Sequence, residues 1–75
     1  MNVRYVSSSH GDWAGVYLNG KLYDEGHSIP VHTWLDLLSE VWEPATMQFE
    51  VDGEWLESCG NLPEFFSDIP KEQLV

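Results

Sequence analysis

The longest stretch of this chain without positive charge runs from Leu22 to Pro70. It contains no lysine or arginine and holds eleven carboxylates. The same stretch is rich in tryptophan, tyrosine and phenylalanine, whereas disordered acidic segments are poor in aromatic residues. A chain of this kind must therefore fold around its aromatic side chains, and it must do so against the mutual repulsion of charges of one sign.

The length of 75 residues and the net charge of −10 limit what the protein can be. We expect residues 1–75 to form a single acidic domain with a small core. The single cysteine, Cys59, excludes an internal disulfide, and neither a signal peptide nor a membrane-spanning segment is recognisable. These features predict a cytoplasmic protein. The charge disfavours direct binding to nucleic acid or to a membrane and favours a basic protein surface as partner.

The first third of the chain predicts a strand and a hairpin. Asn2–Val6 has the apolar content of a short strand, and residues 7–12 are typical of a loop. Trp13–Leu18 and Lys21–Glu25 flank Asn19-Gly20, a dipeptide that favours a type I′ turn because both central residues of that turn need a positive φ. In this hairpin Trp13, Tyr17 and Leu22 are expected to share one face.

An amphipathic helix is predicted next. Ser28 is the expected N-cap, Pro30 falls in the first turn, and Pro44 ends the helix. The apolar residues that recur at helical spacing are Val31, Trp34, Leu35, Leu38, Val41 and Trp42.

A second hairpin is predicted around Asp52-Gly53. Thr46–Val51 alternates between apolar and polar residues, and Glu54–Ser58 is the expected return strand. The apolar face of this hairpin should meet the helix, while its outer face should carry Trp55 among carboxylates. The tail, Leu62–Val75, is expected to form short helical turns that cover the core.

These elements predict an α+β domain. Its sheet would be antiparallel and would consist of two hairpins and the N-terminal strand. One helix would pack on one face, and a short helical tail would follow.

Two rows of carboxylates have a spacing of the same order as that of phosphates along a nucleic-acid strand. Asp36, Glu40 and Glu43 form a row on the polar side of the helix, where residues four apart are about 6 Å apart along the axis. Glu50 and Asp52 form a second row, because same-face strand residues are about 6.6 Å apart. The predicted partner-binding residues are Asp24, Glu25, Asp36, Glu40, Glu43, Glu50, Asp52, Glu54, Trp55 and Glu57.

The sequence leaves two questions open, one about Trp55 and one about the role of the acidity. Trp55 is either an exposed interface residue or a residue that the tail covers. The acidity either copies nucleic acid or serves solubility only, and in that case an apolar hairpin face would form a homodimer or a general interaction module.

Candidates for catalysis or metal binding are few. They are His10 with Asp12, His27 with His32, and Cys59, and their spacing matches no zinc motif. No phosphate-binding loop or nucleophile motif is present. We therefore predict a protein with no catalytic residues, no metal and no cofactor.

The segment from Asn19 to Leu38 resembles the hairpin and helix of the small acidic phage inhibitors of uracil-DNA glycosylase. Its Asn-Gly-Lys turn is followed by Tyr23, Glu25 and His27 and then by a helix led by serine. The resemblance implies a phage-type protein that occupies the DNA-binding cleft of an enzyme as a nucleic-acid mimic. It also implies that Asp24, Glu25, Trp34 and Leu38 are positions of interest.

Overall fold

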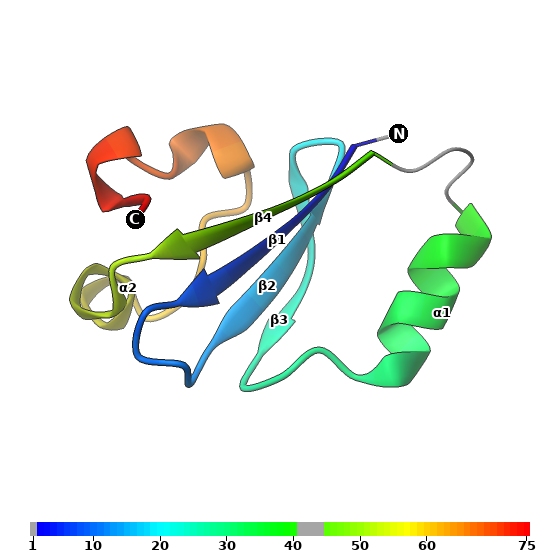
Figure 1. The fold of residues 1–75 in the computed structure, drawn as a ribbon, viewed down its shortest axis with the longest axis horizontal. Helices are drawn as coiled ribbons and strands as arrows, with labels where there is room; N and C mark the ends of the chain where they lie inside the picture. Colours follow the sequence, from blue (N-terminus) through cyan, green and yellow to red (C-terminus); the bar gives the residue numbers. More distant parts are fainter. Residues whose placement is uncertain (1, 41–44) are drawn as a thin grey trace.

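The sheet of this protein is mixed, and its parallel pair lies at one edge. A computed structural model describes residues 2–40 and 45–75 (Figure 1). The strands are β1 (Asn2–Ser8), β2 (Ala14–Leu18), β3 (Lys21–Gly26) and β4 (Ala45–Val51); the helices are α1 (Val31–Glu40) and α2 (Gly53–Cys59), and two 3₁₀ turns follow at Phe66–Asp68 and Lys71–Gln73. The strand order is β3-β2-β1-β4, in which β1 is antiparallel to β2 and parallel to β4. The predicted α+β class is confirmed.

The first hairpin is confirmed as well. Asn19 and Gly20 both have a positive φ, 52° and 86°, as a type I′ turn requires. Strands β2 and β3 pair across this turn, with a bulge between Val16 and Tyr17. Trp13, Tyr17 and Leu22 all belong to one core cluster, so their predicted common face is also confirmed.

The prediction of a second hairpin around Asp52-Gly53 is wrong. Gly53 begins α2 instead of completing a turn, and β4 pairs with β1 instead of with a return strand. An added Cβ at Gly53 would lie 2.4 Å from the His10 ring, so this glycine permits a close approach and does not supply a positive φ. The backbone N–H of Gly53 donates to Ser9 Oγ at 2.8 Å, so the β1–β2 loop satisfies one of the free N–H groups in the first turn of the helix.

Helix α1 begins later than predicted and faces a different way. Proline disfavours the helical conformation for the residue before it, here Ile29, and the helix starts only after Pro30. The Pro30 carbonyl accepts the first helical bonds, and Ser28 is not the cap. Leu37 is the innermost side chain, at 1% exposed. The predicted Val41, Trp42, Glu43 and Pro44 lie outside the described residues.

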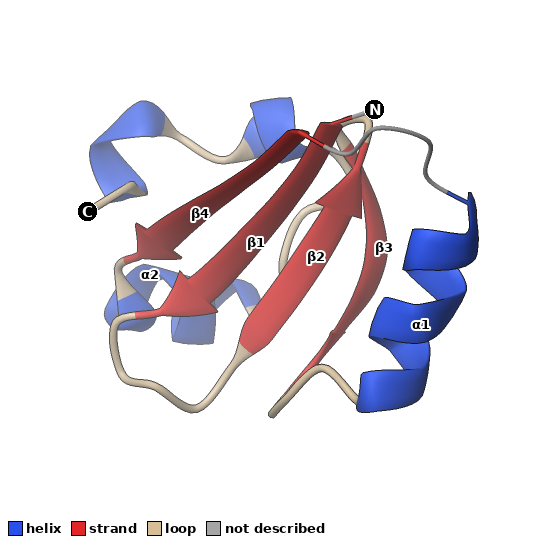
Figure 2. Ribbon diagram, turned by 45° about the vertical axis from the view of Figure 1, so that its right-hand side comes forward, coloured by secondary structure: helices blue, strands red, loops and turns tan. Residues whose placement is uncertain are grey.

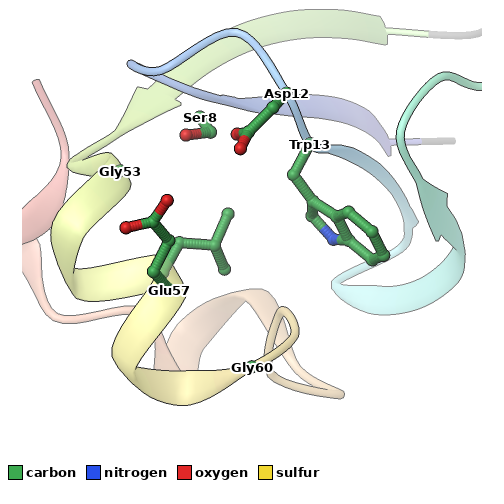
Figure 3. Close-up of a pocket in the computed structure, with 7 residues that line it drawn as sticks. Ser8, Asp12, Trp13, Gly53, Glu57 and Gly60 are labelled. Atoms are coloured by element: carbon green, nitrogen blue, oxygen red, sulfur yellow. The ribbon is translucent and has the colours of Figure 1, made fainter.

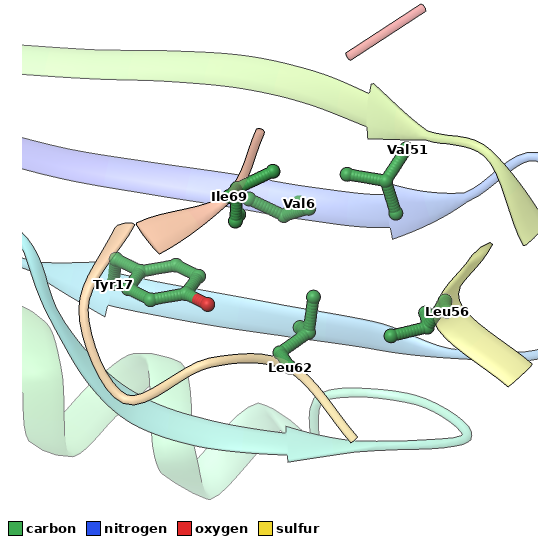
Figure 4. Packing of buried hydrophobic residues seen from close by; sticks show 6 residues of the cluster. All are labelled: Val6, Tyr17, Val51, Leu56, Leu62 and Ile69. Atoms are coloured by element: carbon green, nitrogen blue, oxygen red, sulfur yellow. The ribbon is translucent and has the colours of Figure 1, made fainter. Parts of the chain in front are cut away.

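Two apolar clusters lie on opposite faces of the sheet. On the face that we call the α1 face, Leu37 and Trp34 pack against Val3 and Val16. The other face, here the tail face, is covered by α2 and the C-terminal segment (Figure 2). Its cluster is shown in Figure 4 and consists of Val6, Tyr17, Val51, Leu56, Leu62 and Ile69. The apolar side of β4 therefore meets the tail and α2, where the sequence predicted α1.

The C-terminal segment pairs with both edges of the sheet. Near β3, the Leu22 N–H donates to the Glu64 carbonyl, and Lys21 forms a bridge with Phe65. Near β4, the Asp52 N–H donates to the Gln73 carbonyl at 2.9 Å. The segment thus crosses the tail face from one edge strand to the other, which confirms that the tail covers the core.

Candidate partner-binding surfaces

Five carboxylates gather where β1 and β4 end. Asp12 belongs to the β1–β2 loop, Glu50 to the last residues of β4, Asp52 to the junction with α2, and Glu54 and Glu57 to α2 (Figure 1). All are exposed except Asp52, which is half-buried. We call these five residues the acidic end. The sequence predicted four of them as binding residues; Asp12 was missed because a loop far away in the sequence supplies it.

A small pocket opens at the acidic end. It has a volume of about 80 Å³ and is lined by Ser8, Asp12, Trp13, Gly53, Leu56, Glu57 and Gly60 (Figure 3). The carboxyl groups of Asp12 and Glu57 lie on its polar side, and Trp13 and Leu56 form an apolar wall. The space equals that of roughly two to three water molecules. Its charge and size suit the end of a basic side chain.

The β1–β2 loop is attached to α2 beside this pocket. His10 Nδ1 lies 3.3 Å from Glu57 Oε1, and both side chains are largely exposed. The ring of His10 also lies against Gly53, where no Cβ intervenes. These contacts hold Asp12 and Glu57, which are far apart in the sequence, at the same pocket.

The two predicted binding residues on β3 form hydrogen bonds within the fold. Asp24 Oδ2 accepts from Thr33 Oγ1 at 2.9 Å and so ties α1 to β3. Glu25 Oε1 accepts from Trp13 Nε1 at 3.0 Å and from the Leu62 backbone N–H at 2.9 Å. Both residues are half-buried. Their carboxylates serve as acceptors for the protein's own donors.

Glu25 also affects a buried tyrosine. The Tyr17 hydroxyl donates to the Pro63 carbonyl at 2.6 Å, and the side chain is fully buried. Burial raises the pKa of Tyr17 well above its ordinary value, and the negative charges of Glu25 and Asp68 raise it further. This tyrosine therefore stays neutral and holds the tail at Pro63.

The helical acidic row is described only at its first residue. Asp36 is exposed. The side chain of Glu40 and the whole of Glu43 lie outside the described residues, so the row of Asp36, Glu40 and Glu43 stays a prediction. At 100° per residue, Asp36 lies on the side of α1 opposite to Trp34.

Trp55 lies on α2 and not on the outer face of a hairpin. It is half-buried and packs against the cluster on the tail face. Of the two interpretations from sequence, the structure therefore favours a covered tryptophan.

A larger groove lies on the α1 face, and the sequence did not predict it. It has a volume of about 340 Å³ and is lined by Val3, Tyr5, Trp34, Thr46, Met47 and Gln48. At Tyr5 and Gln48 it adjoins a second depression, which Glu50 also lines. Beside it, α1 exposes Val31, Leu35 and Leu38, at 74%, 62% and 53%. The sequence does contain a signal for this surface. The apolar residues of α1 extend around more of the helix than its contact with the sheet can bury.

The remaining candidates for chemistry lie apart from one another. His27 Nδ1 is 3.0 Å from the Asp12 carbonyl oxygen, its ring packs edge-on against Trp13, and Cys59 is exposed. Within residues 2–40 and 45–75, no three His, Cys, Asp or Glu side chains are grouped so that they could hold a metal ion. Over the same residues, no helix has the length and apolar character needed to cross a membrane.

Comparisons with protein-family models, curated proteins and solved structures found no match to this chain. The likeness to the uracil-DNA glycosylase inhibitors therefore stays a prediction from residues 19–38.

Proposed function

We propose that this protein is a small acidic binding protein without catalytic activity, of a phage or mobile-element type. It inhibits a nucleic-acid-binding protein by occupying that protein's basic surface. The observation that carries the proposal is the acidic end, where five carboxylates meet on an ordered fold with a net charge of −10. A basic cleft that binds phosphates would attract such a surface.

Two of the three cationic residues lie away from the acidic end, and the third, Lys71, faces a larger number of carboxylates there. The Arg4 guanidinium lies 4.5 Å from the centre of the Phe66 ring, on the tail face. Lys21 Nζ lies 3.8 Å from Glu64 Oε1 at the β3 edge. Lys71 belongs to the last 3₁₀ turn, which adjoins the end of β4 through the bond from the Asp52 N–H to the Gln73 carbonyl. The negative field at the acidic end can therefore steer a basic partner, and association should be fast and sensitive to salt.

The test begins with affinity capture of nucleic-acid-binding proteins on the immobilised protein. Captured proteins are then titrated across ionic strength, with and without competing duplex DNA. We expect the affinity to fall with salt and the DNA to displace the protein. An affinity that ignores salt, together with no competition by DNA or RNA, would overturn the proposal.

Two variants of equal net charge separate the acidic end from general acidity. One variant changes Asp12 to Asn and Glu50, Glu54 and Glu57 to Gln. The matched control removes the same charge elsewhere, at Asp36, Glu64, Asp68 and Glu72. All eight side chains are exposed, so both variants should fold. We expect the first to lose binding and the control to keep most of it; equal losses would mean that only bulk charge matters.

A homodimer or general interaction module, with acidity for solubility only, is the second candidate. The predicted hairpin faces do not supply its surface, because Tyr17 is buried under the tail and Val16 under α1. The exposed Val31, Leu35 and Leu38 beside the groove are the observation that favours it.

A further inference from the structure

We infer that the groove on the α1 face, together with the exposed apolar side of α1, docks an amphipathic helix of the basic partner. This inference rests on the proposed function, since it takes the basic partner from there. It adds an apolar anchoring site that adjoins the acidic end at Glu50.

The sheet leaves room for a second helix next to α1. The contacts of α1 reach β1, β2 and β3: Leu37 packs with Val3 and Val16, and Thr33 bonds to Asp24. On the same face, β4 is exposed at Thr46 and Gln48. Four strands spaced about 4.8 Å apart extend over roughly 14 Å between the outer axes, whereas one helix is about 10 Å wide. A partner helix can therefore lie along β1 and β4, at the usual distance between packed helices.

The apolar residues of α1 continue from the core into this groove. The angles around the helix axis can be counted from Trp34 in the direction that leads away from the buried Leu37. At 100° per residue, Leu38 and Val31 lie about 40° and 60° from Trp34 in this direction, and Leu35 lies about 100° from it. Val31, Leu35 and Leu38 are spaced by four and then three residues, the interval of a helix–helix seam. A monomer exposes such a stripe to water at a cost, which a docked helix would remove.

Charge selects the kind of helix. Arg4 lies on the tail face and Lys21 at the β3 edge, whereas Lys71 belongs to the 3₁₀ turn beside the end of β4, where the five carboxylates of the acidic end outnumber it. The groove leads along β4 to Glu50, about 13 Å from Thr46, which equals roughly nine residues of a helix. A partner helix can thus place apolar side chains beside Trp34 and lysine or arginine at the acidic end. A second copy of the chain would instead bring another charge of −10.

The probe for the experiment is a synthetic helical peptide with leucine at the a and d positions of each heptad and lysine elsewhere. Two matched peptides replace either the lysines by glutamate or the leucines by glutamine. Binding is measured by calorimetry, and the site is mapped by amide chemical shifts. We expect the Leu/Lys peptide alone to bind tightly, with shifts at Tyr5, Trp34, Leu38 and Gln48.

Two variants that each add one negative charge decide whether the groove is used. Leu38→Glu changes the proposed seam, whereas Phe65→Glu changes another exposed apolar residue, at the β3 edge. If charge attraction alone caused binding, both variants would bind the basic peptide at least as tightly as the wild-type protein does. We expect Leu38→Glu to weaken binding at least tenfold and Phe65→Glu to leave it unchanged. The amide spectra of both variants should retain the folded pattern.

The outcomes separate this inference from the proposed function. Salt-sensitive binding that is equal in all variants overturns the groove and leaves the charge proposal standing. Equal binding of the Leu/Glu and Leu/Lys peptides overturns the basic partner and, with it, the charge proposal. A dimer in sedimentation that Leu38→Glu dissociates assigns the groove to a second copy and overturns the inference. Failure of all three peptides to bind the folded protein also overturns it.

Discussion

Replacing Glu25 by alanine should destabilise this protein, although the change reduces its net negative charge. Glu25 Oε1 accepts from the Trp13 indole and from the Leu62 backbone N–H, and it joins β3 to the end of the β1–β2 loop and to the start of the C-terminal segment. Alanine would leave both donors without this acceptor in a half-buried site. Relief of repulsion acts in the opposite direction, so the sign of the effect shows which one dominates.

The magnitude follows from the two bonds. A hydrogen bond to a charged group contributes about 1.5–3 kcal/mol, and partial access of water at this site lowers the sum of two to about 2–4 kcal/mol. A domain of this length has a free energy of unfolding of roughly 4–11 kcal/mol. The variant should therefore lose a large fraction of its stability, with a midpoint of thermal unfolding lower by about 13–25 °C.

The assay is urea unfolding followed by tryptophan fluorescence, with linear extrapolation to water. Asp36→Ala is the matched control, since it removes the same charge from an exposed position. It should change the free energy of unfolding by less than about 0.5 kcal/mol. If the two variants unfold at the same urea concentration, the Glu25 carboxylate has no structural role and the reasoning is refuted.

Three further predictions concern other parts of the fold. Gly53→Ala should lower the free energy of unfolding by about 1–2 kcal/mol because its Cβ would overlap the His10 ring, and a double-mutant cycle with His10→Ala should remove most of that loss. Since the pKa of Tyr17 is raised in the folded state, the contribution of this hydroxyl to stability should be constant below pH 10.0, its ordinary value, and should fall above it, because the unfolded chain releases its proton first. Tyr17→Phe should flatten that alkaline fall in urea titrations at successive pH values. Because charges of one sign dominate, added sodium chloride should raise the urea midpoint of the wild type, and an unchanged midpoint would show that self-repulsion is small.

Local turn chemistry made the first half of the fold predictable. Asn19-Gly20 has few alternatives to a type I′ turn, and the face shared by Trp13, Tyr17 and Leu22 follows from its register. Asp52-Gly53 carries the same kind of signal but starts a helix. Only the position of His10, distant in sequence, explains why a glycine is needed at that place.

The alternation of apolar and polar residues in β4 does not predict which strand it pairs with. The pattern of Phe49 and Val51 shows which side of the strand is apolar, and both do face a core cluster. It does not show whether the neighbouring strand is the next segment or β1, because periodicity of two is the same in either case. The groove on the α1 face was missed for this reason, since it exists only where α1 and β4 flank β1.

The low number of cations gives the carboxylates a double role. Lysine and arginine are strong partners for a half-buried carboxylate, whereas here Asp24 and Glu25 are held by a hydroxyl, an indole and backbone N–H groups. Part of the acidity is therefore explained by the fold itself, without any partner. The carboxylates free to act on a partner are a smaller set, and the acidic end is where the structure brings several of them together. A partner that is attracted only by the total charge would lose the same affinity whether carboxylates are removed at the acidic end or elsewhere. A partner that docks at the acidic end would lose more affinity when they are removed there.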